Sequence, residues 1–269
     1  MKDMMIYVEN PKGGSGKSMV ALPLIQYLID RYAGHKTVHL VETDPINPDM
    51  GRVYQGRIPV TPIILDKDET GWITLTRLLQ REANKDTIIV INGSAYNGEG
   101  IQENGPNLSD IFEAGLLPSY QVAVLWPMTT LADCVDLLES FLNVIQCGAV
   151  FPIRNLKEGK PTDFTLFEDR YRSSELFQRR ITKVLDLPKL NSTIAQEVRN
   201  CDLPIPLAID KIGIYEVQSL KRWQAKVYDM LESTGLFDET EETPSPQENK
   251  KSRKKSVEEP ETAGMAEAQ

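Results

Sequence analysis

Residues 10–18, near the N-terminus, carry the strongest chemical signal in the sequence. They read Asn-Pro-Lys-Gly-Gly-Ser-Gly-Lys-Ser and lie between a short apolar run and a segment with helical spacing of apolar residues. Glycines in such a turn let backbone N–H groups face phosphate oxygens, and the N-terminus of the following helix adds the positive end of its dipole. Lys17 is then placed to reach the β- and γ-phosphates of a nucleotide, and the Ser18 hydroxyl to ligate Mg²⁺.

This loop departs from the common phosphate-loop pattern G-x-x-x-x-G-K-[ST]. Pro11 takes the first glycine position, and a second lysine, Lys12, follows it. K-G-G-x-G-K-[ST] is the deviant Walker A signature of the ParA/MinD family, and this loop resembles it closely. The resemblance extends in order and spacing over roughly residues 4–232 and is much looser outside the loop. It implies that ATP is bound by Lys12, Gly13, Gly14, Ser15, Gly16, Lys17, Ser18 and Met19.

The same resemblance implies a mechanism. In that family the extra lysine, here Lys12, crosses a dimer interface to touch the partner's nucleotide, so that two subunits sandwich two ATP molecules. A second cation that acts only in the dimer makes ATP binding a dimerisation switch. The implied partners are a second copy of the chain and DNA or a DNA-bound adaptor protein. The implied role is partition or positioning of plasmid DNA in the bacterial cytoplasm, with association to the nucleoid.

Two further motifs follow later strands. Glu42-Thr43-Asp44-Pro45 is similar to the family motif D-x-D-P, which implies that Asp44 is catalytic and, with Ser18, belongs to the metal shell. A polar loop at the end of a strand is the alternative interpretation. Asn92 stands where the family has the switch II aspartate, and it supplies no negative charge. Either hydrolysis is slow, or Asp44 and Glu42 carry the metal's charge alone.

Other positions have two interpretations each. Gly93, Gly98 and Gly100 predict either a mobile loop that senses the γ-phosphate or an ordinary flexible surface loop. Asn155 is either the residue that hydrogen-bonds the adenine edge, as in the family, or a turn residue at a strand end. Residues 200–206 resemble the family segment that closes over the base.

Four arginines predict a surface for DNA phosphates or, alternatively, a solvated helix face with internal ion pairs. They are Arg170, Arg172, Arg179 and Arg180.

Apolar runs alternate with helical patterns along the chain, which predicts an α/β fold with a parallel twisted sheet flanked by helices. Residues 1–235 form the expected P-loop ATPase domain, and 236–269 a disordered charged tail. Strands are expected at 4–9, 37–41, 87–92, 120–126 and 148–153. Helices are expected at 18–32, 72–82, 109–114, 130–145, at 214–231, and as a pair over 163–186.

Composition excludes several classes. The net charge of −9 argues against a strongly basic nucleic-acid binder, although a local basic face stays open. Three widely spaced cysteines and two histidines match no zinc pattern. No apolar run has the length of a membrane span. The leading hypothesis is a dimerising ParA/MinD-like ATPase. The alternative is a nucleotide-gated binding module with little turnover, accessory to conjugation or plasmid stability. An iron–sulfur reductase is disfavoured, because Cys134 and Cys147 lie on or beside one predicted helix.

Overall fold

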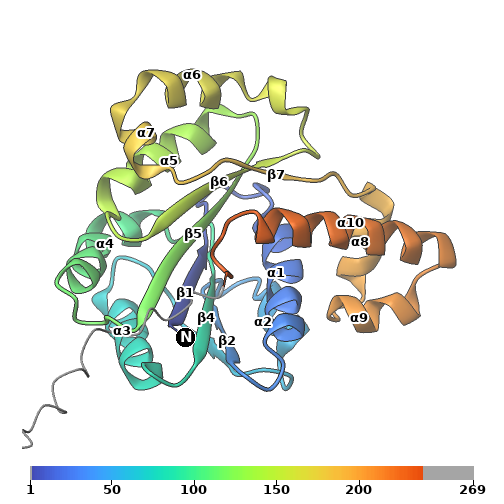
Figure 1. The fold of residues 1–269 in the computed structure, drawn as a ribbon, viewed down its shortest axis with the longest axis horizontal. Helices are drawn as coiled ribbons and strands as arrows, with labels where there is room; N and C mark the ends of the chain where they lie inside the picture. The colour runs from blue at the N-terminus through green and yellow to red at the C-terminus, as the bar shows by residue number, and fades with distance from the viewer. Residues whose placement is uncertain (1, 239–269) are drawn as a thin grey trace, which may run out of the picture. The chain divides into compact units, whose positions relative to one another are not determined.

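The computed structural model describes residues 2–238. Within them one seven-stranded sheet has the order β3-β2-β4-β1-β5-β6-β7, and every neighbouring pair is parallel (Figure 1). The strands are β1 (Asp3–Val8), β2 (Thr37–Glu42), β3 (Val60–Pro62), β4 (Thr87–Asn92), β5 (Tyr120–Met128), β6 (Ala149–Asn155) and β7 (Leu185–Leu187). This confirms the predicted α/β class. Residues 239–269, most of the predicted tail, lie outside the described residues.

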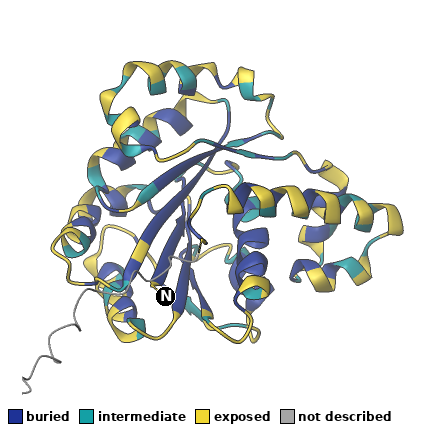
Figure 2. Cartoon of the chain, viewed as in Figure 1, coloured by how far each residue is buried: buried dark blue, intermediate teal, exposed yellow. Residues whose placement is uncertain are grey.

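Helices cover both faces of the sheet (Figure 1). One apolar core joins the sheet to α1 (Lys17–Arg31), α2 (Asp49–Tyr54), α8 (Ser192–Asn200), α9 (Ile205–Ala208) and α10 (Ile214–Glu232). The second core lies on the other face, against α3 (Glu69–Glu82), α4 (Gly98–Glu113), α5 (Ala132–Val144), α6 (Thr165–Ser173) and α7 (Glu175–Arg180). Because both faces are covered, the inner strands are apolar without alternation, and every residue of β1 and β4 is buried (Figure 2).

Helix α1 is the element that follows the phosphate loop, and it lies deep in the first core. All nine residues from Val20 to Leu28 are buried. A helix that is apolar on all sides fits only between two packed layers, and here α1 lies between the sheet and α10. The helix continues through Pro23. The N-terminus that faces the phosphate loop is therefore fixed by the core.

The prediction for α4 was wrong at its start. The sequence predicted a short helix over 109–114, whereas the helix begins at Gly98 and Ser109 lies inside it, buried. Glycine and proline disfavour helices, so the residues of the first turns of α4 did not predict a helix. Tertiary packing requires these glycines: a Cβ on Gly100 would lie 2.3 Å from the Leu65 carbonyl oxygen, and one on Gly105 would lie 2.8 Å from Val144.

Other differences concern short or late elements. The strand β7 replaces the end of the helical pair expected over 163–186, and β3, α2 and α8 were not predicted. Leu236 and Phe237, which the sequence assigned to the tail, are buried in the first core. Within residues 2–238, no helix has the length and apolar character needed to cross a membrane.

Candidate nucleotide-binding site

The phosphate loop connects β1 to α1 at the carboxyl edge of the sheet. Gly14 and Gly16 have φ angles of +79° and +112°, in the left-handed region that side chains disfavour. A Cβ on Gly16 would also lie 2.7 Å from Asn155 Nδ2, so only glycine fits there. Asn10 fastens the loop to the neighbouring strand, because its Nδ2 donates to the Pro127 carbonyl at 2.8 Å. The backbone is therefore held in the shape that a phosphate requires.

The side chain of Lys17 folds back toward the backbone of this loop. Its Nζ donates to the carbonyl oxygens of Asn10 at 2.6 Å and Lys12 at 3.3 Å. Burial lowers the pKa of Lys17, and the carboxylates of Glu9, Asp44 and Asp49 oppose that change. The ammonium group is thus the central cation of the site, and phosphate oxygens would complete its coordination.

Ser18 meets an acidic residue that the sequence analysis missed. Its hydroxyl donates to a carboxylate oxygen of Asp49, the first residue of α2. The signal was present, since Pro48-Asp49 is typical of a helix start, but the short helix was not recognised. Asp44 was the predicted metal residue. Its Oδ1 instead accepts from the backbone N–H groups of Ile46 and Asn47, at 2.9 and 2.7 Å.

Asn92 lies between two carboxylates. Its Nδ2 donates to both oxygens of Glu42, at 3.0 and 3.2 Å, and to Asp49 Oδ1 at 3.3 Å. Glu42 Oε2 also accepts from the backbone N–H of Gly51 at 2.9 Å. Burial raises the pKa of Glu42 to about 7. An aspartate at position 92 would place a third negative charge in this buried group, whereas the amide supplies a donor.

These residues suit a magnesium ion that is held mainly by a nucleotide. No three His, Cys, Asp or Glu residues converge on one point in residues 2–238, so the chain supplies no complete cage there. Mg²⁺ in phosphate-transfer sites takes one or two protein ligands, phosphate oxygens and water. Ser18 and Asp49 are already adjacent. The buried Asn92 Oδ1 has no hydrogen-bond partner among residues 2–238, and it is free to accept from a metal-bound water.

Lys12 lies on the outer side of the loop. Its Nζ pairs with Asp133 Oδ2 at 2.5 Å, and the two side chains are 36% and 60% exposed. Asp133 is in the first turn of α5, and its hydrogen bond raises the pKa of Lys12. The two lysines of the loop therefore differ in their contacts: Lys17 is half-buried and donates to backbone carbonyls of the loop, whereas Lys12 pairs with an exposed carboxylate on the outer side.

A cavity of about 260 Å³ adjoins the loop on the side of β6 and β7. Asn155 lines it, although both ends of its amide have protein partners: Nδ2 donates to the Ser15 carbonyl at 3.2 Å, and Oδ1 accepts from the Lys157 N–H at 3.2 Å. The other lining residues include Gly14, Ser15, Gly16, Lys17, Ser18, Met19, Leu187, Pro188, Ser192, Ala195 and Arg199. Helix α8 contributes Ser192, Ala195 and Arg199 to its lining.

The loop after β4 is shorter than predicted. Gly98 and Gly100 belong to α4, so the segment between strand and helix is residues 93–97. A Cβ on Gly98 would lie 3.3 Å from Pro11, which places the start of α4 against the phosphate loop.

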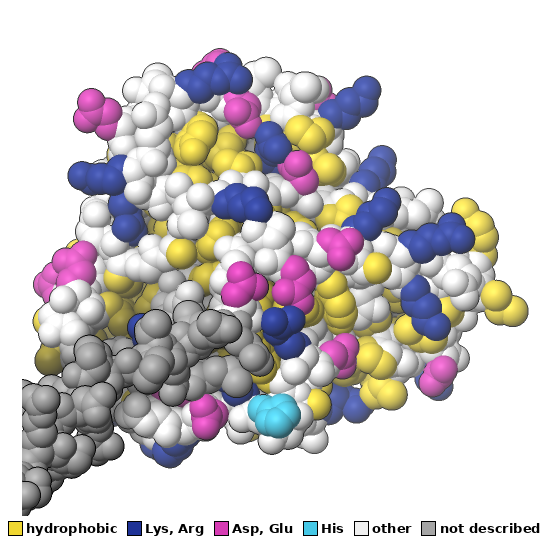
Figure 3. All heavy atoms as spheres, viewed as in Figure 1, with side chains coloured by type: hydrophobic (Ala, Val, Ile, Leu, Met, Phe, Trp, Pro, Cys, Tyr) yellow, Lys and Arg dark blue, Asp and Glu magenta, His cyan; other side chains and the backbone are white. Residues whose placement is uncertain are grey.

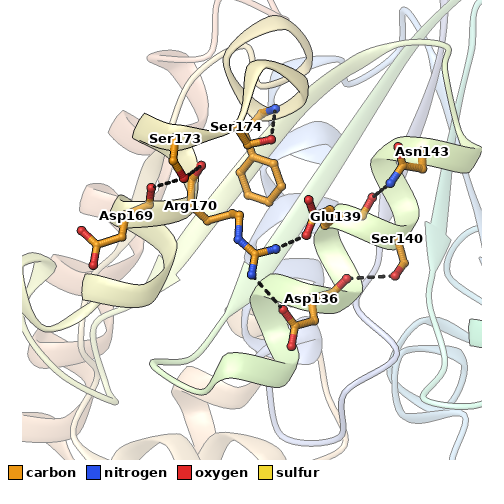
Figure 4. Close-up of polar contacts among 9 residues, drawn as sticks. Asp136, Glu139, Ser140, Asn143, Asp169, Arg170, Ser173 and Ser174 are labelled. Carbon is orange, nitrogen blue, oxygen red and sulfur yellow. Dashed lines mark hydrogen bonds and ion pairs between the residues drawn. The ribbon is translucent and has the colours of Figure 1, made fainter.

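The four predicted DNA-binding arginines differ in their contacts. Arg170 pairs with Asp136 and Glu139 of α5 (Figure 4). Arg180 Nη2 donates to the Ile145 carbonyl at 2.9 Å, and Arg172 lies 3.9 Å from Glu168. Arg179 is exposed. On the face shown in Figure 3, basic and acidic side chains are interspersed. The arrangement matches the alternative interpretation of internal ion pairs for Arg170 and Arg172.

No family model matches the sequence. The chain is 27% identical to Protein MobD from Acidithiobacillus ferrooxidans over 235 residues, which is 86% of this chain and 98% of that protein. A plasmid partition protein from Borrelia burgdorferi is 16% identical and has a TM-score of 0.44, covering 79% of this chain and 100% of the other. The Signal Recognition Particle 54 kDa protein from Aeropyrum pernix K1, in complex with GDP, is 14% identical with a TM-score of 0.43. That match covers 87% of this chain and 49% of the other.

The resemblance rests on the topology of the sheet and on the phosphate loop with its two lysines. All strands are parallel, and the glycine-rich turn lies between a central strand and a buried helix. The chain places a glycine-rich phosphate loop at the carboxyl edge of a parallel sheet, and in this it resembles P-loop ATPases of the ParA/MinD type.

Proposed function

We propose that this protein binds Mg-ATP at residues 10–18, forms an ATP-dependent homodimer and acts as a switch in partition, positioning or stable inheritance of plasmid DNA. The proposal rests on the different surroundings of the two lysines in the phosphate loop. Lys17 is half-buried and bonded to carbonyls of its own loop, where it would face a nucleotide bound to its own subunit. Lys12 is exposed on the outside, where it can face a second subunit.

Exposed apolar residues support a dimer at this edge. Ile46, Tyr96 and Leu131 are 72%, 59% and 54% exposed. They follow β2, β4 and β5, which with β1 form four adjacent strands of the parallel sheet. Their loops therefore share the edge that carries Lys12. Large apolar residues beside a nucleotide site are typical of a surface that another protein covers.

Hydrolysis would proceed by in-line attack of water on the γ-phosphate. Lys17 and the partner's copy of Lys12 would stabilise the charge that develops on the phosphate. Bound Mg²⁺ would neutralise charge on the β- and γ-oxygens, held through Ser18 with Asp49 or Asp44 beside it. Asp44 is the candidate for orienting the water, on the resemblance of its motif.

ATP as the nucleotide, and a plasmid-related role, rest on the resemblance of the loop to the ParA/MinD signature. The similarity to Protein MobD spans nearly the whole of that protein, which supports a shared fold and a shared site. Asn155 lines the candidate base cavity, as the adenine hypothesis requires. Competition between ATP and GTP for the purified protein tests the base preference.

The second candidate is a nucleotide-gated binding module with little turnover. Asn92 favours it, because the amide occupies the place of a catalytic-site carboxylate and already satisfies Glu42 and Asp49. Such a protein would use ATP binding alone to expose a surface for a partner.

Steady-state ATP hydrolysis with Mg²⁺, alone and with nonspecific double-stranded DNA at low salt, separates the two. DNA-stimulated turnover supports the partition-type switch. Tight ATP binding without turnover in both conditions supports the gated module. Failure of the protein to bind any nucleoside triphosphate contradicts both.

A further inference from the structure

Glu9 is a buried carboxylic acid that the proposed mechanism does not use. It follows β1 directly, and its side chain has no exposed surface. Its Oε1 has no hydrogen-bond partner among residues 2–238. Burying such a group costs free energy unless it is paired, so its position beside the phosphate loop needs a reason.

The other carboxylate oxygen reaches the loop after β4. Asn97 Nδ2 donates to Glu9 Oε2 at 2.9 Å, and the same amide lies 2.9 Å from Thr43 Oγ1 and 3.1 Å from the Tyr7 hydroxyl. Asn97 is the residue that precedes α4, and it is 1% exposed. The hydrogen bonds therefore join the ends of β1 and β2 to the start of α4.

Close packing also places the Glu9 side chain against the start of the segment 93–97. A Cβ on Gly93 would lie 2.3 Å from Glu9 Oε2, and the Gly93 N–H donates to the Val8 carbonyl at 2.9 Å. The loop 93–97 thus touches the Glu9 carboxylate at both of its ends, through Gly93 and Asn97.

Glu9 is also the acidic group that acts most strongly on Lys17. Among the carboxylates that oppose the lowered pKa of Lys17, Glu9 has the largest effect. Burial raises the pKa of Glu9 to about 6, and the charge of Lys17 opposes this rise. Tyr7 is the other titratable group that faces Glu9, and it is buried and protonated, since burial raises its pKa further. Asn97 and Thr43 are neutral.

We propose that Glu9 is a positioning residue that couples the phosphate loop to residues 93–97, by holding Asn97 next to Asn10, whose carbonyl oxygen binds Lys17. Phosphates that engage Lys17 bring negative charge toward Glu9, and the change reaches Asn97 through one hydrogen bond. The inference rests on the proposed nucleotide binding. In it, Glu9 makes residues 93–97 respond to bound phosphates, a role that the neutral Asn92 does not fill.

The coupling has a proton signature. When phosphates engage Lys17, less positive charge remains to stabilise the Glu9 carboxylate, so its pKa rises from about 6. ATP binding near pH 7 should therefore be accompanied by proton uptake that Glu9→Gln abolishes. Titration calorimetry in two buffers of different ionisation enthalpy measures this uptake, and the difference between wild type and variant removes the protons that ATP itself exchanges.

Hydrogen–deuterium exchange of the full chain tests the coupling directly. In the wild type, Mg-ATP at about 100 times its Kd should slow amide exchange by up to about a hundredfold at residues 10–18 and also at 93–97. Glu9→Gln, which keeps the shape of the side chain, should retain protection at 10–18 and lose it at 93–97. Asn97→Ala cuts the same link from its other end and should behave alike. Glu113→Gln, an exposed carboxyl at the far end of α4, is the control and should match the wild type.

The outcomes separate this inference from the proposed function. If the wild type shows no protection at 10–18, nucleotide binding itself fails. If the wild type is protected in both segments, and Glu9→Gln keeps the protection at 93–97, the role assigned to Glu9 is wrong.

Discussion

Lys12 is the residue on which the dimer proposal depends. In the single chain its ammonium group pairs with Asp133, and the two side chains are 36% and 60% exposed. An exposed ion pair of this kind contributes little to stability and exchanges readily for another partner. The phosphates of a second subunit would compete with Asp133 for the same cation.

Lys12→Ala should leave ATP binding to the monomer largely intact and abolish the ATP-dependent dimer. Light scattering after size-exclusion chromatography, with and without Mg-ATP, measures both states. Asp133→Asn is the matched variant, since it frees Lys12 and should keep or strengthen the dimer. A dimer that persists in Lys12→Ala would remove the nucleotide sandwich from the proposal.

Asn92 decides between turnover and simple binding. Asn92→Asp replaces the donor between Glu42 and Asp49 with a third carboxylate. Without metal the variant should be less stable, by on the order of 1–3 kcal/mol for the lost buried hydrogen bonds. With Mg-ATP it should hydrolyse faster, if placement of the metal limits the rate. Urea unfolding and steady-state turnover measure the two effects. Unchanged turnover would count against a metal-limited rate.

At the scale of elements, the end of α10 and the residues after it close the first core over α1. The Phe237 ring lies 5.1 Å from that of Tyr27 in an edge-on arrangement, and Arg31 Nη2 donates to the Phe237 carbonyl at 2.8 Å. Phe237 is 2% exposed. These contacts stabilise the helix whose N-terminus forms the phosphate site.

Phe237→Ala should lower the free energy of unfolding by about 3–5 kcal/mol, because it leaves a cavity beside α1. Tyr215→Ala, at a side chain that is 77% exposed, should change it by less than about 0.5 kcal/mol. Thermal or urea unfolding compares the two variants. Equal stabilities would show that residues 236–237 are not part of the folded core.

For the whole molecule, two buried acids make stability depend on pH. Burial raises the pKa of Glu9 to about 6 and that of Glu42 to about 7, above the value of 4.5 of an unperturbed Glu. Between pH 4.5 and 7 these two groups therefore bind more protons in the folded chain than in the unfolded chain. The free energy of unfolding contributed by these groups falls as pH rises through this window.

Between pH 5 and pH 8 the nucleotide-free protein should lose about 1 kcal/mol of stability from Glu9 and about 2–3 kcal/mol from Glu42. Urea unfolding at a series of pH values gives the profile. The double variant Glu9→Gln with Glu42→Gln should flatten it. A wild-type stability that rises over this range would contradict the assignment.

The phosphate loop could be predicted because its functional residues are contiguous. Lys17, Ser18 and the glycines follow one another between a strand and a helix, so their spacing alone specifies a phosphate cradle. The α/β class was predictable for a similar reason, since long apolar strands alternate with helical patterns. The full length of helix α4 was harder to predict from the sequence. Its glycines are required by contacts that form only when the chain is packed.

Only the tertiary structure decided which polar groups meet. Ser18 with Asp49, Asn92 with Glu42, and Glu9 with Asn97 are pairs separated by 31 to 88 residues. Parallel strands are joined by crossover helices, so neighbours in the sheet are distant in the chain and their pairing is not written in local spacing. The arginines illustrate the same limit: the sequence shows a basic segment, and only the packing of α6 against α5 places Arg170 on Asp136 and Glu139. The sequence by itself therefore determined the chemistry of the phosphate loop, and the fold determined the acids and amides that surround it.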